Sequence, residues 1–279
     1  MDRLQGYRKM LRTGDWIKFY PLFPLAGACL AAGVVTDMVT VVVLFCFVTA
    51  YGFVINNLYD VEIDRRHAGK TAGGKNPLTG SGVTMRGTQV LCAALAVIPL
   101  LVSFAISIAG FLFTLLSLAA LTAYSARPLR LKDRFAADIL CHGIMFGGLP
   151  FLAGYTLAGG DLTSIFSPAV AYAVLCTLIC CEALIIHEIL DYHEDLGTTY
   201  TTVVGIGLRN GVGLLAIVAA LSVAVLEATA WWFGIDTVIH GMALAFLLVY
   251  PVYGCRDILV KEAERWYGWF RNDYGFRVR

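Results

Sequence analysis

The sequence predicts an all-α integral membrane protein, a bundle of about eight to nine transmembrane helices in two similar halves around a central cavity. Of its 279 residues, 58% are hydrophobic and 15% are charged, whereas a soluble domain carries about 25% charged residues. The hydrophobic residues fall in runs long enough to cross a bilayer, which takes about 20 residues of helix. Two acidic motifs with the same spacing follow two of these runs, and this repetition indicates the two halves.

Eight hydrophobic segments are candidate spans. In chain order they cover residues 17–35, 39–58, 89–108, 109–124, 139–158, 168–190, 212–233 and 235–255. Residues 256–279 mix aromatic and charged side chains, so we expect an interfacial amphipathic tail there rather than a ninth span. The whole chain, 1–279, is expected to form a single membrane domain, with halves at roughly 17–135 and 139–255.

The basic residues are confined to alternate connections. All 21 Lys and Arg lie before or at the start of the first span, in the loops after the second, fourth and sixth spans, or in the tail. The connections at 36–38, 109–110, 159–167 and 234–236 contain none. By the positive-inside rule, both termini and the basic loops are expected on the cytoplasmic side of a multi-pass protein, which we expect in the cell membrane. A net charge of +1 gives no reason to expect nucleic acid as a partner.

Two acidic motifs stand at the ends of the second and sixth spans. Asn56, Asp60 and Asp64 follow one another at intervals of four, a spacing that places side chains in one stripe of a helix. Asp191 and Asp195 repeat the spacing 131 residues after Asp60 and Asp64. Because both motifs follow even-numbered spans, both are expected on the same side of the membrane as the basic loops.

These carboxylates indicate a metal site. Proteins commonly hold Mg²⁺ with one or two carboxylates and the phosphate oxygens of a substrate. The basic loops would neutralise a diphosphate, whereas four close Asp residues without a cation would repel one another. Ordinary solvated acids at span ends are the simpler interpretation, but two matching motifs favour a site. A transporter would place its ion ligands near the membrane midplane rather than at the ends of spans.

The two motifs resemble those of the UbiA superfamily of intramembrane prenyltransferases, and the resemblance covers most of the chain. Three more segments are similar to segments of that family: Lys75-Asn76-Pro77-Leu78-Thr79-Gly80, the stretch from Tyr124 to Lys132, and Thr201-Thr202 through Gly207. Members of the family usually have nine spans, against eight candidates here.

The resemblance implies roles for these residues. Mg²⁺ and, through it, a prenyl diphosphate would be held by Asn56, Asp60, Asp64, Asp191 and Asp195, of which the four Asp residues are catalytic. The residues expected to bind substrate are Asn56, Lys75, Tyr124, Arg127, Arg130, Lys132, His187 and Glu188. The family pattern has a basic residue four positions after the Tyr, but position 128 is Pro, so Arg127, Arg130 and Lys132 are alternatives for that role.

The implied activity is the Mg²⁺-dependent transfer of a prenyl group from a prenyl diphosphate to a lipophilic acceptor, with release of diphosphate, in the biosynthesis of isoprenoids, lipids or quinones. Its partners would be the donor, the acceptor and membrane lipid. Two other enzymes are alternatives: a UbiA-type terpene cyclase, and an enzyme that transfers a phosphoribosyl group to a polyprenyl phosphate, which Trp16-Ile17-Lys18 suggests. A transporter is the less favoured alternative.

Several aromatic and polar side chains lie within or beside the spans. The aromatic residues Tyr51, Phe53, Tyr59, Tyr124 and Phe146 either pack in the core or line the cavity. An ionisable side chain inside the membrane calls for a partner, which we expect most strongly for Glu182. For His142, Glu227 and His240 we expect structural roles.

Overall fold

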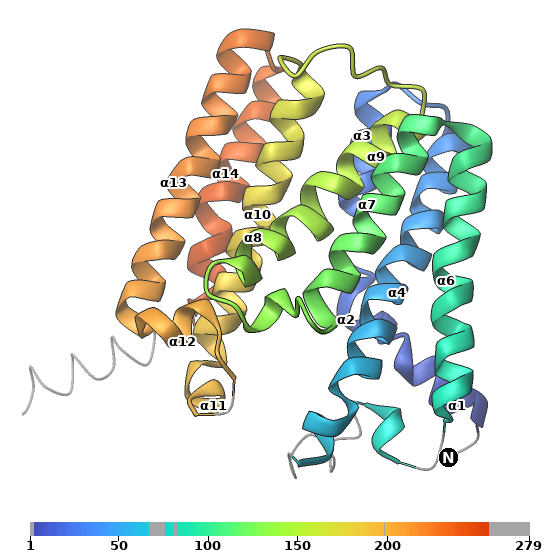
Figure 1. Ribbon diagram of the computed structural model, residues 1–279. Coiled ribbons are helices and arrows are strands. Elements are labelled where there is room, and N and C mark those ends of the chain that lie inside the picture. The colour runs from blue at the N-terminus through green and yellow to red at the C-terminus, as the bar shows by residue number, and fades with distance from the viewer. Residues whose placement is uncertain (1–2, 67–75, 81–82, 198, 257–279) are drawn as a thin grey trace, which may run out of the picture. The chain divides into compact units, whose positions relative to one another are not determined.

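The computed structural model describes residues 3–66, 76–80, 83–197 and 199–256 (Figure 1). Every regular element in these residues is a helix, which confirms the predicted class. The chain divides into two compact units, Met1–Cys181 and Glu182–Arg279, and helix α10 (Pro168–Leu190) passes from the first into the second. The expected amphipathic tail, except Arg256, lies outside the described residues.

The helices of the first unit, besides the first part of α10, are α1 (Arg3–Met10), α2 (Thr13–Trp16), α3 (Leu22–Leu30), α4 (Val35–Arg66), η1 (Pro77–Thr79), α6 (Met85–Ile106), α7 (Ile108–Ser125), η2 (Leu131–Asp133), α8 (Ala137–Gly143), η3 (Ile144–Gly148) and α9 (Leu149–Leu157). Among them, η1 and η2 are 3₁₀-helices and η3 is a π-helix. The second unit adds α11 (Tyr192–Asp195), α12 (Thr202–Ile206), α13 (Leu208–Phe233) and α14 (Thr237–Gly254).

Seven helices in the described part of the chain are long and apolar enough to cross a membrane. They are Val35–Glu62, Met85–Ile106, Ile108–Ser125, Ala137–Leu157, Pro168–Leu190, Leu208–Phe233 and Thr237–Gly254. These seven correspond to the second to eighth predicted spans. The sequence therefore predicts the membrane fold correctly, with helix ends displaced by a few residues.

The first predicted span, 17–35, is wrong as a single helix. Helix α2 ends at Trp16, and α3 covers only Leu22–Leu30. Pro21 and Pro24 explain the interruption, because proline lacks the backbone N–H of a helix interior and disfavours the helical conformation in the residue before it. With nine residues, α3 is about 13 Å long, less than half of the hydrocarbon core of a bilayer.

This interrupted segment still covers the length of the first unit. Trp16, at its start, packs in a cluster with Met10 and Ile55, which is near the end of α4. Gly33, at its other end, lies beside Ala158 and close to the start of α4. The segment therefore runs from one end of the unit to the other, antiparallel to α4, and the number of chain crossings in the unit is the one that the sequence predicts.

Helices α3 and α9 pack closely in the core of the first unit. A Cβ atom added at Gly27 would lie 2.0 Å from the carbonyl oxygen of Phe151, and one added at Gly154 would lie 2.0 Å from that of Pro24. Small residues allow helix backbones to approach in this way, which membrane helices use in place of the hydrophobic effect. The short, interrupted α3 is held by this contact, and a larger side chain at either glycine would separate the two helices.

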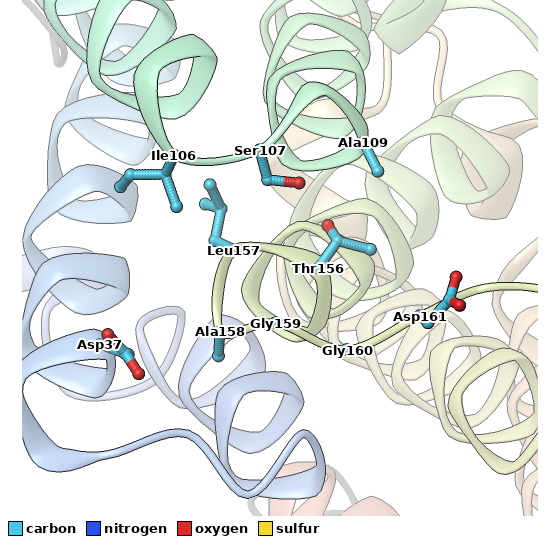
Figure 2. A pocket seen from close by; sticks show the side chains of 10 residues that line it. All are labelled: Asp37, Ile106, Ser107, Ala109, Thr156, Leu157, Ala158, Gly159, Gly160 and Asp161. Carbon is cyan, nitrogen blue, oxygen red and sulfur yellow. The ribbon is translucent and has the colours of Figure 1, made fainter.

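A shallow cavity of about 540 Å³ marks the end of the first unit where α3 finishes and α4 begins (Figure 2). Its lining comes from Asp37, from Ile106, Ser107 and Ala109 at the α6–α7 connection, and from residues 156–161 after α9. These connections are the ones without Lys or Arg. Within the described residues of this unit, the predicted basic connections lie at the opposite end.

In the second unit, α13 and α14 pack against each other. His240 Nε2 on α14 lies 3.0 Å from Glu227 Oε1 on α13, so the two ionisable residues are partners. Trp231 and Trp232, at the end of α13, are strongly exposed, as is typical of aromatic side chains at a membrane interface. The His240–Glu227 pair lies near this end of the helices, where a structural contact between them suits the expected roles.

Glu182 joins α10 to α13 inside the second unit. Its side chain is completely buried and contacts the Ser222 hydroxyl through Oε1, while Oε2 has no partner among the described residues. Ser222 Oγ also lies 3.1 Å from the carbonyl oxygen of Val218, which can only accept. A hydroxyl has one proton, so both contacts are satisfied together when a protonated Glu182 donates to Ser222. We therefore interpret Glu182 as a neutral acid in a hydrogen bond between two helices.

We predict that Glu182→Gln keeps the unfolding midpoint of the detergent-solubilised protein, because a neutral amide N–H can donate to Ser222 as the acid does. Ser222→Ala should lower the free energy of unfolding by about 1 kcal/mol, since it leaves a buried polar group without its partner. Thr40→Ala is the matched control, because the Thr40 hydroxyl bonds the Thr36 carbonyl of its own helix. Equal losses in Glu182→Gln and Ser222→Ala would contradict a protonated Glu182.

Candidate active site

The first acidic motif lies on a single helix, as its spacing predicts. Helix α4 continues past the predicted span end at 58 to Arg66, so Asn56, Asp60 and Asp64 form one stripe. Its 32 residues make it about 48 Å long, against a hydrocarbon core of about 30 Å. The acidic stripe therefore stands on the polar end of a membrane-spanning helix.

Two cations from one loop meet the carboxylate of Asp60. Arg130 Nη2 donates to Asp60 Oδ1 at 2.9 Å, and Lys132 Nζ pairs with Asp60 Oδ2. Lys132 Nζ also donates to Asn56 Oδ1 at 2.7 Å. The side chains of Arg130, Lys132 and Asp60 are each about 85% buried. Of the three predicted basic residues, Arg130 and Lys132 both reach the stripe, whereas Arg127 is exposed.

The pKa values of the two cations reflect their surroundings. Burial lowers the pKa of Lys132 below its usual value, while Asp60 acts in the opposite direction. Burial also acts to lower the pKa of Arg130, but hydrogen bonds and charges from Asp133 and Asp60 together raise it. Two buried cations that share one Asp60 carboxylate can also bind the oxygens of an anionic substrate.

Asp64 is held by a residue that the sequence analysis quoted but gave no role. Asn76 Nδ2 donates to Asp64 Oδ2 at 2.9 Å and to the carbonyl oxygen of Asn57 at 2.8 Å. Asn76 Oδ1 accepts from Leu78 N at 3.1 Å, which starts η1. The buried Asn76 therefore fixes η1 against α4 and orients Asp64. Its position before a proline, in the segment that resembles the family, was the only signal for it. Lys75, the predicted substrate-binding residue beside Asn76, lies outside the described residues.

The end of α7 adds contacts on the other side of the stripe. Ser125 Oγ donates to Asn56 Oδ1 at 3.2 Å, so Asn56 accepts from both Ser125 and Lys132. Tyr124, a predicted substrate-binding residue, is half-buried one position earlier, and its ring lies 6.3 Å from the ring of His142. Ser125 was not predicted as a site residue, since a Ser at the end of an apolar helix is an ordinary residue there.

The second motif lies in the second unit, at the end of α10. Asp191 and Asp195 are one helical turn apart, because Asp195 N donates to the carbonyl oxygen of Asp191 at 2.9 Å. His187 Nε2 lies 3.5 Å from Asp191 Oδ2, as expected for residues four apart on a helix. His187 is exposed and Asp191 is half-buried, so both can be reached by a ligand.

Glu188, a predicted substrate-binding residue, has a structural contact. It is buried, and its Oε2 accepts from Val203 N at 3.0 Å, in the first turn of α12. Thr201 caps the same helix by accepting from Val204 N at 3.3 Å. Glu188 therefore fastens the segment that follows the second motif to the end of α10.

We predict that Glu188→Gln keeps this contact, because the amide retains a carbonyl oxygen, and that Glu188→Leu loses it. Loss of a side-chain cap costs about 1 kcal/mol, so amide hydrogen exchange at the start of α12 should accelerate about fivefold in the Leu variant. Hydrogen-exchange mass spectrometry of residues 199–207 gives the measurement. Unchanged amide hydrogen exchange in Glu188→Leu would show that Glu188 does not stabilise the start of α12.

The oxygen donors of the first motif suit a hard cation. The stripe provides two carboxylates and one amide oxygen, the ligand types that Mg²⁺ prefers. The described residues contain no cluster of three or more His, Cys, Asp or Glu side chains placed to hold a metal. This donor set fits Mg²⁺, because that ion is commonly held by one or two carboxylates and completed by water and substrate phosphates.

Comparison with known proteins gives a family for the chain. The model of the UbiA prenyltransferase family matches residues 21–272. No curated relative matches the chain.

Solved structures share the fold. A UbiA homologue from Archaeoglobus fulgidus bound to DMAPP and Mg²⁺ has a TM-score of 0.75 at 22% identity, with 88% of this chain and 85% of that chain covered. The same homologue bound to GPP and Mg²⁺ gives 0.74 at 23% identity, with 88% and 86% covered. An apo UbiA homologue from Aeropyrum pernix K1 gives 0.69 at 21% identity, with 84% and 86% covered.

Proposed function

This chain belongs to the UbiA prenyltransferase family, and we propose that it transfers a prenyl group from a prenyl diphosphate to a lipophilic acceptor and releases diphosphate. The observation that carries the proposal is the convergence of Arg130 and Lys132 on Asp60, beside the oxygens of Asn56. This arrangement offers anionic oxygens to a divalent cation and cations to a diphosphate within one small site.

The proposed metal is Mg²⁺. Asn56, Asp60 and Asp64 would contribute oxygens from α4, and Asp191 and Asp195 remain proposed ligands from the resemblance to the family. DMAPP and GPP are prenyl diphosphates, and each is bound together with Mg²⁺ in a solved structure of a UbiA homologue from Archaeoglobus fulgidus. This similarity supports the substrate class and the metal.

The cations act on the leaving group. As the bond between C1 of the prenyl group and the diphosphate oxygen breaks, its electron pair moves to the diphosphate. When bound, Mg²⁺ supplies Lewis-acid stabilisation of that charge. Lys132 and Arg130 donate hydrogen bonds to it from fixed, buried positions, where such contacts are stronger than in water. An acceptor atom then bonds to C1, and the acceptor loses a proton.

We place this site on the cytoplasmic side of the cell membrane. The basic loops of the first unit lie at the same end as the acidic stripe, and the connections without Lys or Arg lie at the other end around the cavity in Figure 2. The positive-inside rule then directs the stripe to the cytoplasm.

Asp60→Asn should reduce Mg²⁺-dependent release of diphosphate from labelled geranyl diphosphate by at least 100-fold, because it removes the negative charge that would bind the metal and that holds both cations. The matched control is Asp161→Asn, an exposed residue at the other end of the first unit, which should stay within threefold of the wild type. Chelation of Mg²⁺ should abolish the release and re-addition should restore it. Undiminished release by Asp60→Asn would overturn the proposed site. If the donor alone gave a cyclic hydrocarbon, the enzyme would be a cyclase and not a transferase.

Lys132→Met and Arg127→Met test which basic side chain binds the diphosphate. Because Lys132 is buried beside Asp60 and Arg127 is exposed, the first variant should raise the KM for the prenyl diphosphate by at least tenfold and the second by less than threefold. Steady-state kinetics at saturating Mg²⁺ give both values. The reverse order would assign the diphosphate contact to Arg127.

A further inference from the structure

The first unit contains a hydrogen-bonded chain that the metal and diphosphate chemistry does not use. The Tyr20 hydroxyl lies 3.2 Å from His142 Nε2, and His142 Nδ1 lies 3.0 Å from the carbonyl oxygen of Cys180. A carbonyl oxygen only accepts, so Nδ1 carries the proton and Nε2 accepts from Tyr20. In the neutral imidazole, the basic nitrogen is therefore Nε2, which is directed at a phenol.

An irregular helix builds this arrangement. His142 is in the last turn of α8, and the π-helix η3 follows directly, a form that often marks functional sites. A Cβ atom at Gly143 would lie 2.6 Å from the carbonyl oxygen of Thr177, and one at Gly147 would lie 2.2 Å from that of Cys176. These glycines let α10 approach closely, and the approach brings the Cys180 carbonyl to His142.

Aromatic rings surround the pair. Tyr20 stacks on Phe146 with ring centroids 4.2 Å apart, and the His142 and Phe146 rings are 4.8 Å apart. Phe146 also lies 6.5 Å from Phe53 on α4. Phe53 is seven residues before Asp60, so it shares the face of the stripe at a distance of about 10 Å along the helix. The cluster therefore lies on the membrane side of the acidic stripe.

A short series of contacts connects the pair to the acidic stripe. The ring of Tyr124 lies 6.3 Å from that of His142, and the next residue, Ser125, donates to Asn56. His142 is buried, whereas Tyr20 is only partly buried. A substrate that extends from the stripe towards the aromatic cluster would approach this pair, of which Tyr20 is the more exposed member.

We propose that Tyr20 and His142 form a proton relay that takes up the proton of an acceptor hydroxyl during transfer. This inference rests on the proposed prenyl transfer and assigns two residues of this chain to its proton transfer. Tyr20 touches the acceptor and is the catalytic residue, and His142 acts through Tyr20 as a positioning residue that also holds the proton.

The proton and electron movements balance. The bond from C1 to the diphosphate oxygen breaks with its electron pair on diphosphate, and the acceptor oxygen bonds to C1. The acceptor hydroxyl gives its proton to the Tyr20 oxygen while Tyr20 gives its own to His142 Nε2. His142 Nδ1 keeps its hydrogen bond to the Cys180 carbonyl, which stabilises the imidazolium. The proton returns through Tyr20 to water after the product leaves.

The test uses a lipophilic alkyl-nitrophenol as a probe, because its absorbance reports ionisation and no natural acceptor is needed. The full-length protein in detergent is saturated with Mg²⁺ and a prenyl thiodiphosphate, which does not react, at a pH where the free probe is neutral. The wild type should convert the bound probe to phenolate. Tyr20→Phe should reduce the ionised fraction at least tenfold. His142→Gln should do the same, because Gln can accept the Tyr20 hydrogen bond but takes up no proton.

Tyr51→Phe is the matched control, because it also removes a half-buried Tyr hydroxyl with one hydrogen bond, to Thr122 at 2.6 Å. It should ionise the probe as the wild type does. Absence of ionisation by the wild type, or equal ionisation in Tyr20→Phe or His142→Gln, would overturn the relay.

A second measurement separates the relay from the proposed function. Mg²⁺-dependent diphosphate release from geranyl diphosphate by the wild type tests the proposed transfer, and the unfolding midpoints of Tyr20→Phe and His142→Gln test the folding of the variants. Both midpoints should match that of Tyr51→Phe, and a loss of ionisation that comes with a lowered midpoint in both variants would also overturn the relay, because it would assign both residues to folding. Loss of release in the wild type would overturn prenyl transfer itself, whatever the probe shows.

Discussion

The negative charge of Asp60 is the constraint on which the described site depends. Its side chain is only 13% exposed, on a helix that continues into the membrane, and a buried carboxylate is costly without a counter-charge. Arg130 and Lys132 provide that charge from the loop after α7. To reach it, Arg130 takes a left-handed conformation, with φ of 41°, which costs a residue with a side chain about 1 kcal/mol or more. The ion pairs therefore fix the loop, and the loop fixes both cations beside the stripe.

Hydropathy and spacing predicted the parts of the fold that depend on local sequence. Seven spans and the stripe on α4 follow from runs of apolar residues and from a repeat of four, which need no knowledge of distant contacts. The first span was wrong because an average over the segment hides Pro21 and Pro24, whose effect is on backbone geometry. The contacts of Arg130 and Lys132 with the stripe also could not be predicted, since they depend on one backbone angle at Arg130 and on the position of Asp60, 70 residues away.

The Tyr20–His142 pair illustrates a different limit of prediction from sequence. The two residues are 122 positions apart in the sequence, and each by itself is an ordinary polar residue in or beside an apolar run. What makes them a pair is the packing of α10 on the glycines of η3, which sets the direction of the imidazole through the Cys180 carbonyl. A sequence can suggest close packing through Gly143, Gly147 and Gly148, but the tautomer of His142 follows only from the three-dimensional contact.

The two cations that face the stripe and the imidazole of His142 occupy different surroundings for a physical reason. In the proposed reaction the leaving diphosphate needs positive charge, which Arg130 and Lys132 would supply at the polar end of α4. A base that must accept a proton works poorly beside such cations, because like charge disfavours an imidazolium. His142 lies among the aromatic rings around Phe146, towards the membrane from the stripe, and apolar rings there would limit the access of water to a prenyl cation. Between these two groups, α4 spans the distance from Asp60 to Phe53, about 10 Å. One rigid helix thus sets the spacing between the departure of the leaving group and the removal of the proton.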